Sequence, residues 1–113
     1  MNVFISHQQK DSVLAKIIYN ELRRKNVDAY LDVLDNLHEK NGEYLTNHLK
    51  EIMASSSDIL VVMTENTKDS WWVPFEIGMA AERNLRTVTF LNSYLMLPEY
   101  LDYWPRLSSM ALD

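Results

Sequence analysis

The sequence predicts an α/β fold: a flavodoxin-like, doubly wound parallel sheet of four to five strands, flanked by helices. Short apolar stretches rich in β-branched residues alternate along the chain with segments whose apolar residues recur every three or four positions. Such alternation is typical of β-α-β units with right-handed crossovers and a parallel sheet. At 113 residues, the chain is expected to be a single domain spanning residues 1–113.

The first strand and the first helix are predicted from residues 2–25. Residues 2–6 are apolar, with β-branched and aromatic members. Residues 10–25 have the spacing of an amphipathic helix, with an apolar stripe made of Val13, Leu14, Ile17, Ile18 and Leu22. Asp11 is a predicted N-cap, and the cations at 23–25 favour a solvated helix C-terminus because they offset its dipole.

A short strand at 29–31, a polar loop at 32–42 and a second helix are predicted next. The apolar stripe of this helix consists of Tyr44, Leu45, Leu49, Ile52 and Met53, and the helix ends at the serines 55–57. Residues 59–63 are all apolar. They therefore predict a central parallel strand that is covered on both faces.

The last third of the sequence begins with a polar loop at 64–70. A third helix is predicted at about 74–84, because proline is favoured in a first helical turn and Pro74 stands there. Residues 87–91 predict a fourth strand, and we expect one more helix within 92–113.

The fold class also predicts where a ligand binds. In the common strand order 2-1-3-4, ligands lie outside the carboxyl ends of strands 1 and 3, where the winding reverses. That crevice is expected to be lined by Ser6, His7 and Gln8 and by residues 64–76, with the loop 32–42 leaning over it. His7 follows strand 1 directly, which makes it a candidate ligand contact.

The composition argues against several classes of function. With 11 Lys and Arg against 16 Asp and Glu, the net charge is −5, which disfavours nucleic acid as a partner. There is no cysteine, and the three histidines lack metal-ligand spacing, so no metal site is expected. The longest apolar runs have five residues, so no membrane partner is expected, and cytoplasmic localisation is the default. Two glycines cannot form a dinucleotide-binding or Walker A loop.

Glu76 is the leading candidate for chemistry. It is expected in the first turn of the third helix, two positions after Pro74 and close behind Trp71 and Trp72. A carboxylate that is partly desolvated by two indoles can stabilise a cation that forms against it. The competing interpretation is that Glu76 complements the helix dipole and that the tryptophans are core residues.

The residues at the crevice resemble those of a known family. The opening Val-Phe-Ile-Ser-His at 3–7, followed by Lys-Asp and a helix, resembles the start of a Toll/interleukin-1 receptor (TIR) domain. The segment from Asp32 to Gly42 is similar to the end of that family's second strand and its BB loop, and residues 58–63 resemble its third strand.

The most specific part of the resemblance is residues 69–76, Asp-Ser-Trp-Trp-Val-Pro-Phe-Glu, which match the family's S-x-W-x-x-x-E stretch. Trp72 and Glu76 take the W-x-x-x-E positions, and the resemblance covers residues 2–91. The sequence departs from the pattern in two places. Only 22 residues follow the fourth strand, which leaves little room for a fifth strand and a last helix, and His7 replaces an aromatic residue that is common in the family.

The resemblance implies one of two activities. Some TIR domains are scaffolds that assemble through homotypic contacts. Many bacterial and plant members cleave NAD+ at the nicotinamide–ribosyl bond, with the W-x-x-x-E glutamate as catalytic residue, which implies that role for Glu76. NAD+ is then the substrate and no separate cofactor is implied. The residues expected to bind the substrate are Ser6, His7, Asp32, Leu37 and Trp72.

The expected product is ADP-ribose or a cyclic ADP-ribose-type signal. Because the first strand begins at residue 2, the chain resembles a standalone bacterial TIR protein of the Thoeris antiphage-defence type, in which a separate effector reads the product. Self-association through TIR–TIR contacts is expected. Two alternatives stay open: a non-enzymatic TIR–TIR interaction module that uses the loop 32–42, and an enzyme that resembles nucleoside deoxyribosyltransferases and acts on free nucleosides.

Overall fold

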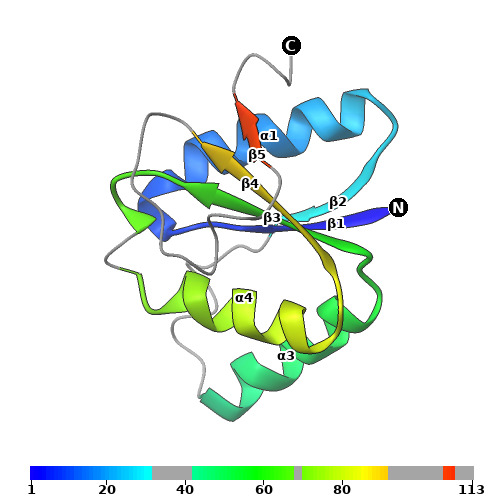
Figure 1. The fold of residues 1–113 in the computed structure, drawn as a ribbon, viewed down its shortest axis with the longest axis vertical. Helices are drawn as coiled ribbons and strands as arrows, with labels where there is room; N and C mark the ends of the chain where they lie inside the picture. The colour runs from blue at the N-terminus through cyan, green and yellow to red at the C-terminus, as the bar shows by residue number, and fades with distance from the viewer. Residues whose placement is uncertain (32–41, 68–69, 92–105, 109–113) are drawn as a thin grey trace.

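A parallel sheet forms the middle of the molecule in the computed structural model, which describes residues 1–31, 42–67, 70–91 and 106–108. The strands lie in the order β2-β1-β3-β4-β5, and every neighbouring pair is parallel (Figure 1). Their bounds are β1 Asn2–Ser6, β2 Asp28–Leu31, β3 Asp58–Met63, β4 Arg86–Leu91 and β5 Arg106–Ser108. The predicted order 2-1-3-4 is confirmed, and the winding reverses between β1 and β3.

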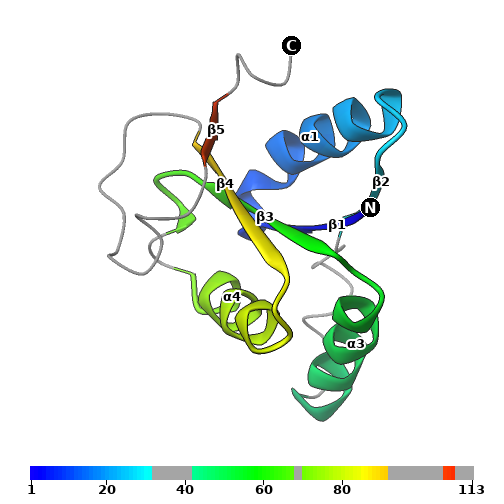
Figure 2. The same ribbon diagram turned by 45° about the vertical axis from the view of Figure 1, so that its right-hand side comes forward.

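Helices cover both faces of the sheet. Helix α1 (Ser12–Arg24) lies on one face, preceded by the 3-10 turn η1 (Gln9–Asp11), whereas α3 (Gly42–Ala54) and α4 (Trp72–Glu82) lie together on the other face (Figure 2). The longest of these helices has 13 residues, and none of the described helices has the length and apolar character needed to cross a bilayer.

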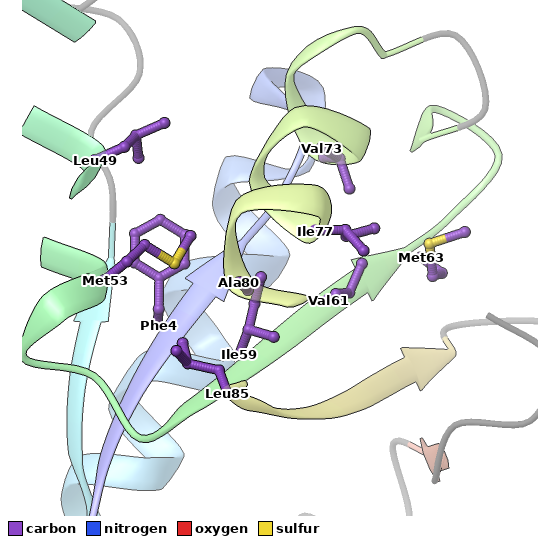
Figure 3. Close-up of a cluster of buried hydrophobic side chains, with 10 residues drawn as sticks. All are labelled: Phe4, Leu49, Met53, Ile59, Val61, Met63, Val73, Ile77, Ala80 and Leu85. Carbon is purple, nitrogen blue, oxygen red and sulfur yellow. The ribbon is translucent and has the colours of Figure 1, made fainter. Parts of the chain in front are cut away.

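The alternation of side chains along the strands divides the core into two halves. In β1, Phe4 packs toward α3 and α4, while Val3 and Ile5 pack toward α1. Strand β3 is buried at all six positions, as its apolar run predicts. Figure 3 shows the half on the α4 side, whose buried members are Phe4, Leu49, Met53, Ile59, Val61, Met63, Val73, Ile77, Ala80 and Leu85.

Two helices end in the same way, at an asparagine. Asn26 after α1 and Asn84 after α4 adopt φ of 63° and 60°, a left-handed conformation that asparagine tolerates better than most residues. The next residue then bonds back into the last turn: the Val27 amide donates to the Leu22 carbonyl at 2.9 Å. These caps turn the chain directly into β2 and β4, which keeps both connections short.

Strand β5 has three residues that pair with β4, which agrees with the predicted four to five strands, and the helix expected within 92–113 falls on residues that are largely outside the described ones. The structure corrects two expectations. Helix α4 begins at Trp72, two residues earlier than predicted. Val13 and Ile17 are exposed, because α1 turns Ala15 and Ile18 toward the sheet instead.

Candidate active site

Polar side chains gather at the carboxyl edge of the sheet, where β1 and β3 end. Ser6 is the last residue of β1, His7 follows it, and Thr64 follows β3, and all three are buried. Moving a polar group out of water costs free energy unless the group forms hydrogen bonds inside the protein. Among the described residues, the edge at which the fold class predicts a ligand site therefore carries several buried polar side chains.

Glu76 lies at this edge of the sheet. Its side chain is only 1% exposed, and its Oε1 accepts a hydrogen bond from the hydroxyl of Ser6 at 2.6 Å. That distance is in the range of charge-assisted O–H···O⁻ bonds. Since Ser6 belongs to the strand at the switch point, the bond anchors the carboxylate beside the end of β1, across 70 residues of sequence.

The start of α4 explains how Glu76 is presented. The Ser70 hydroxyl accepts hydrogen bonds from the amides of Trp72 and Val73, both at 3.1 Å, and so satisfies two of the free amides of the first turn. Glu76 is the fifth residue of the helix, and the first turn contains no acidic residue. The expectation of a first-turn carboxylate is wrong, and the interpretation that Glu76 serves the helix dipole loses its geometric basis.

The two tryptophans have different environments. Trp71 is 94% exposed, so it is not a core residue and does not desolvate Glu76, contrary to the expectation of two flanking indoles. Trp72 is half-buried, packs against the core and lies 5.9 Å from the ring of Phe75. Its indole Nε1 is buried without a hydrogen-bond partner among the described residues. One indole, not two, faces inward.

A second buried carboxylate lies at the same edge. Asp11 precedes α1, as predicted for an N-cap, but its side chain accepts no bond from the helix amides. It accepts instead from Thr64 and Asn66 in the loop after β3. The capping role predicted for Asp11 is therefore wrong. Because the ends of β1 and β3 were predicted to be adjacent, the sequence did contain a signal that Asp11 could contact the polar loop after β3.

The sequence-predicted site residues are thus partly assembled. The structure brings together Ser6 and Glu76, buries His7 at the same strand end, and places Trp72 at the start of the same helix. Asp32 and Leu37 lie outside the described residues. Within the described ranges, no group of three His, Asp or Glu side chains is placed to hold a metal ion. Of the two buried carboxylates at this edge, Glu76 is the one that is bonded to the end of β1.

The family model of the TIR domain matches residues 3–106. A protein of Cytobacillus dafuensis named "Putative cyclic ADP-D-ribose synthase TIR2" is 33% identical over an alignment of 85 residues that covers 72% of this chain. The chain spans about a fifth of that relative's length, 22%.

Two solved structures share the fold. The TIR domain of the Toll-related receptor TRR-2 from Hydra magnipapillata has a TM-score of 0.72 at 14% identity, over 96% of this chain and 83% of that one. The CMP N-glycosidase BcmB of Clostridium botulinum has a TM-score of 0.62 at 13% identity, over 96% and 87% of the two chains. The match of the family model over nearly the whole chain shows that this protein belongs to the TIR domain family.

Proposed function

We propose that this TIR domain consumes NAD+ by cleaving the nicotinamide–ribosyl bond, with Glu76 as the catalytic residue. The observation that carries the proposal is the 2.6 Å bond between Ser6 and Glu76 at the switch point of the sheet. This edge is where ligands bind in doubly wound folds. A buried, oriented carboxylate at that edge suits a reaction that develops positive charge.

The chemistry needs little more than this carboxylate. As the bond between the ribose C1′ and the pyridinium nitrogen breaks, its electron pair goes to that nitrogen, and nicotinamide leaves as a neutral molecule. The ribosyl group becomes an oxocarbenium-like cation, which the Glu76 carboxylate stabilises. The Ser6 hydroxyl holds one carboxylate oxygen, so the charge is oriented before the substrate arrives. Trp72, His7, Asp32 and Leu37 complete the proposed pocket.

The product depends on the nucleophile that reaches the cation. Attack by water releases a proton and gives ADP-ribose, whereas attack by the substrate's own adenine or ribose gives a cyclic product. The name of the Cytobacillus dafuensis relative supports the cyclic product. We extend the proposal to a bacterial antiphage-defence setting of the Thoeris type, in which self-associated TIR domains make a signal for a separate effector.

The decisive experiment is incubation of the protein with NAD+ and identification of the products by mass spectrometry. We expect release of nicotinamide, and a loss of turnover of roughly 10²- to 10³-fold in Glu76→Gln, because the amide keeps the shape but removes the charge. Glu82→Gln is the matched control, since Glu82 is an exposed glutamate on the same helix. Equal activity in Glu76→Gln and wild type would contradict the proposal.

The fold shared with the CMP N-glycosidase supports a second candidate, cleavage of a nucleotide or nucleoside N-glycosidic bond. The two reactions differ in what their leaving groups require. A pyridinium leaves without protonation, whereas a pyrimidine base needs a proton from a general acid. A panel of NAD+, CMP and free nucleosides assayed side by side distinguishes these reactions, and concentration-dependent assembly without turnover of any of them would indicate an interaction module.

A further inference from the structure

The carboxylate of Asp11 joins two segments at the carboxyl edge of the sheet. Asp11 is 6% exposed. Its Oδ2 accepts from the Thr64 hydroxyl at 2.6 Å, and its Oδ1 accepts from the Asn66 side-chain amide at 2.8 Å. Both partners lie more than 50 residues away, in the loop that leaves β3. The carboxylate therefore links the segment after β1 to the segment after β3.

The loop that Asp11 holds is itself bonded to the end of its strand. The Asn66 backbone amide donates to the Thr64 hydroxyl oxygen at 3.1 Å, and the Thr64 amide donates to the Thr67 hydroxyl oxygen at 2.9 Å. The Thr67 hydroxyl in turn donates to the carbonyl of Val62 at 3.0 Å. Because the Thr64 and Thr67 hydroxyls each donate one bond and accept another, residues 64–67 are tied to one another and to the end of β3.

The same loop leads to the helix that carries the proposed catalytic residue. The Ser70 amide donates to the Thr67 carbonyl at 3.0 Å, and the Ser70 hydroxyl caps α4. Glu76 follows in the second turn and accepts from Ser6. Asp11 and Ser6 thus fix the same unit from two sides: Asp11 at the loop before α4, and Ser6 at the carboxylate of Glu76.

We propose that Asp11 is a positioning residue for the NAD+-cleaving reaction, an inference that rests on the function proposed above. Its carboxylate is bonded to the loop after β3, and it acts through that loop. It sets the start of α4 relative to the end of β1, and thereby the place that the Glu76 carboxylate occupies beside the ribose. Misplacement of a reacting group by about 1 Å can lower a rate by roughly 100-fold.

The substitution Asp11→Asn tests this with almost no change of shape. Both Thr64 and Asn66 donate to Asp11, but an asparagine has only one acceptor oxygen there and faces the other donor with an amide. We expect kcat to fall roughly tenfold or more, with KM within about threefold of wild type, because orientation is lost and binding is retained.

A reciprocal exchange provides the rescue. In the double variant Asp11→Asn with Asn66→Asp, the amide at 11 donates to the carboxylate at 66, and the Thr64 hydroxyl donates to the remaining oxygen at 11. Net charge and the number of hydrogen bonds are both restored. We expect kcat to return to within about threefold of wild type. A role of Asp11 that depends on its charge alone predicts no rescue.

Asp58→Asn is the matched control for loss of a buried carboxylate. Asp58 is 8% exposed and accepts from Ser57 and Arg86 at the opposite, amino edge of the sheet. We expect it to lower the melting temperature while leaving kcat within about twofold of wild type. A fall in kcat of the same size as in Asp11→Asn would overturn the positioning role.

A second readout separates this inference from the proposed function. Hydrogen exchange of the Trp72 and Val73 amides, which Ser70 caps, should accelerate roughly tenfold in Asp11→Asn and recover in the double variant. Unchanged exchange in Asp11→Asn overturns the inference whether or not NAD+ is cleaved. An inert wild type with altered exchange rejects the function and retains the positioning. If Asp11→Asn does not fold, Asn66→Ala removes one of the two bonds and should shift both readouts in the same direction.

Discussion

The two edges of the sheet hold buried carboxylates in different ways. At the amino edge, Asp58 accepts from the Ser57 hydroxyl at 2.6 Å and pairs with the Arg86 guanidinium at 3.0 Å. At the carboxyl edge, Glu76 accepts from the Ser6 hydroxyl, also at 2.6 Å, and Asp11 accepts from a hydroxyl and an amide. The carboxylate at the amino edge is paired with a guanidinium, whereas the donors described above for the carboxyl edge, Ser6, Thr64 and Asn66, are neutral groups.

This difference agrees with the function proposed above, in which the carboxyl edge is reactive and the amino edge is structural. The bridge from Arg86 to Asp58 joins β4 to β3 and is exposed to solvent on the arginine side, so it contributes little beyond local stability. Anions that are buried and oriented by neutral donors suit a site that has to stabilise a cation. The comparison therefore supports placing the chemistry at the carboxyl edge.

The largest expected effect comes from removing the same bond at each edge. Ser6→Ala leaves the Glu76 carboxylate buried without that donor, which should lower the free energy of unfolding by about 2 kcal/mol and reduce NAD+ turnover. Ser57→Ala removes an equally short bond, together with the bond at 3.0 Å that the Asn2 amide donates to the same hydroxyl, but at an exposed position where water can replace the hydroxyl, so it should cost only about 0.5 kcal/mol without affecting turnover. Urea unfolding measures the change in the free energy of unfolding for each variant, and equal changes in the two variants would remove the distinction between the edges.

A smaller effect distinguishes two buried threonines. The Thr67 hydroxyl makes two bonds at the carboxyl edge, so Thr67→Val should destabilise the fold by about 1 to 2 kcal/mol. The Thr89 hydroxyl, in β4, is buried without a partner among the described residues, so Thr89→Val should leave stability unchanged or raise it by up to about 1 kcal/mol. Thermal unfolding gives the sign of each change. Destabilisation by Thr89→Val would mean that its hydroxyl is satisfied in solution.

The smallest effect is expected on the surface of α1. The hydrogen bond from Arg24 holds the pKa of Glu21 below its ordinary value of 4.5. A carboxylate whose pKa is lowered by folding stabilises the protein above its unfolded pKa, and this contribution is lost as the pH falls through the folded pKa. In Arg24→Gln, we expect NMR titration to show the pKa of Glu21 rising toward 4.5, with little change in stability at neutral pH because the pair is exposed.

Much of the fold was predictable from local patterns. The all-apolar stretch 59–63 became the buried central strand β3, and the predicted strand order is the observed one. Periodicity was less reliable for the faces of helices. The stripe on α1 included Val13 and Ile17, which are exposed, because an apolar residue at the boundary of a stripe can lie on either side of it.

The candidate site was predictable in part. The spacing of Trp72 and Glu76 and the position of Ser6 at a strand end pointed to the carboxyl edge, where the structure places all three. The partners of Asp11 were missed, because an aspartate before a helix is most often a cap and the bonds that replace the cap come from a distant loop. The different exposures of Trp71 and Trp72 were also missed, since two adjacent tryptophans have the same local preferences.

The sequence by itself determined the alternation of strands and helices, and with it the parallel sheet, because side-chain periodicity and chain chirality act locally. Only the tertiary structure decided which polar groups meet at the switch point. The Ser6 hydroxyl reaches Glu76 and the Asp11 carboxylate reaches Thr64 through the rotation of α4 and the path of one loop. The rotation of α4 and the path of this loop depend on how the core packs as a whole, and no local pattern of residues specifies that packing.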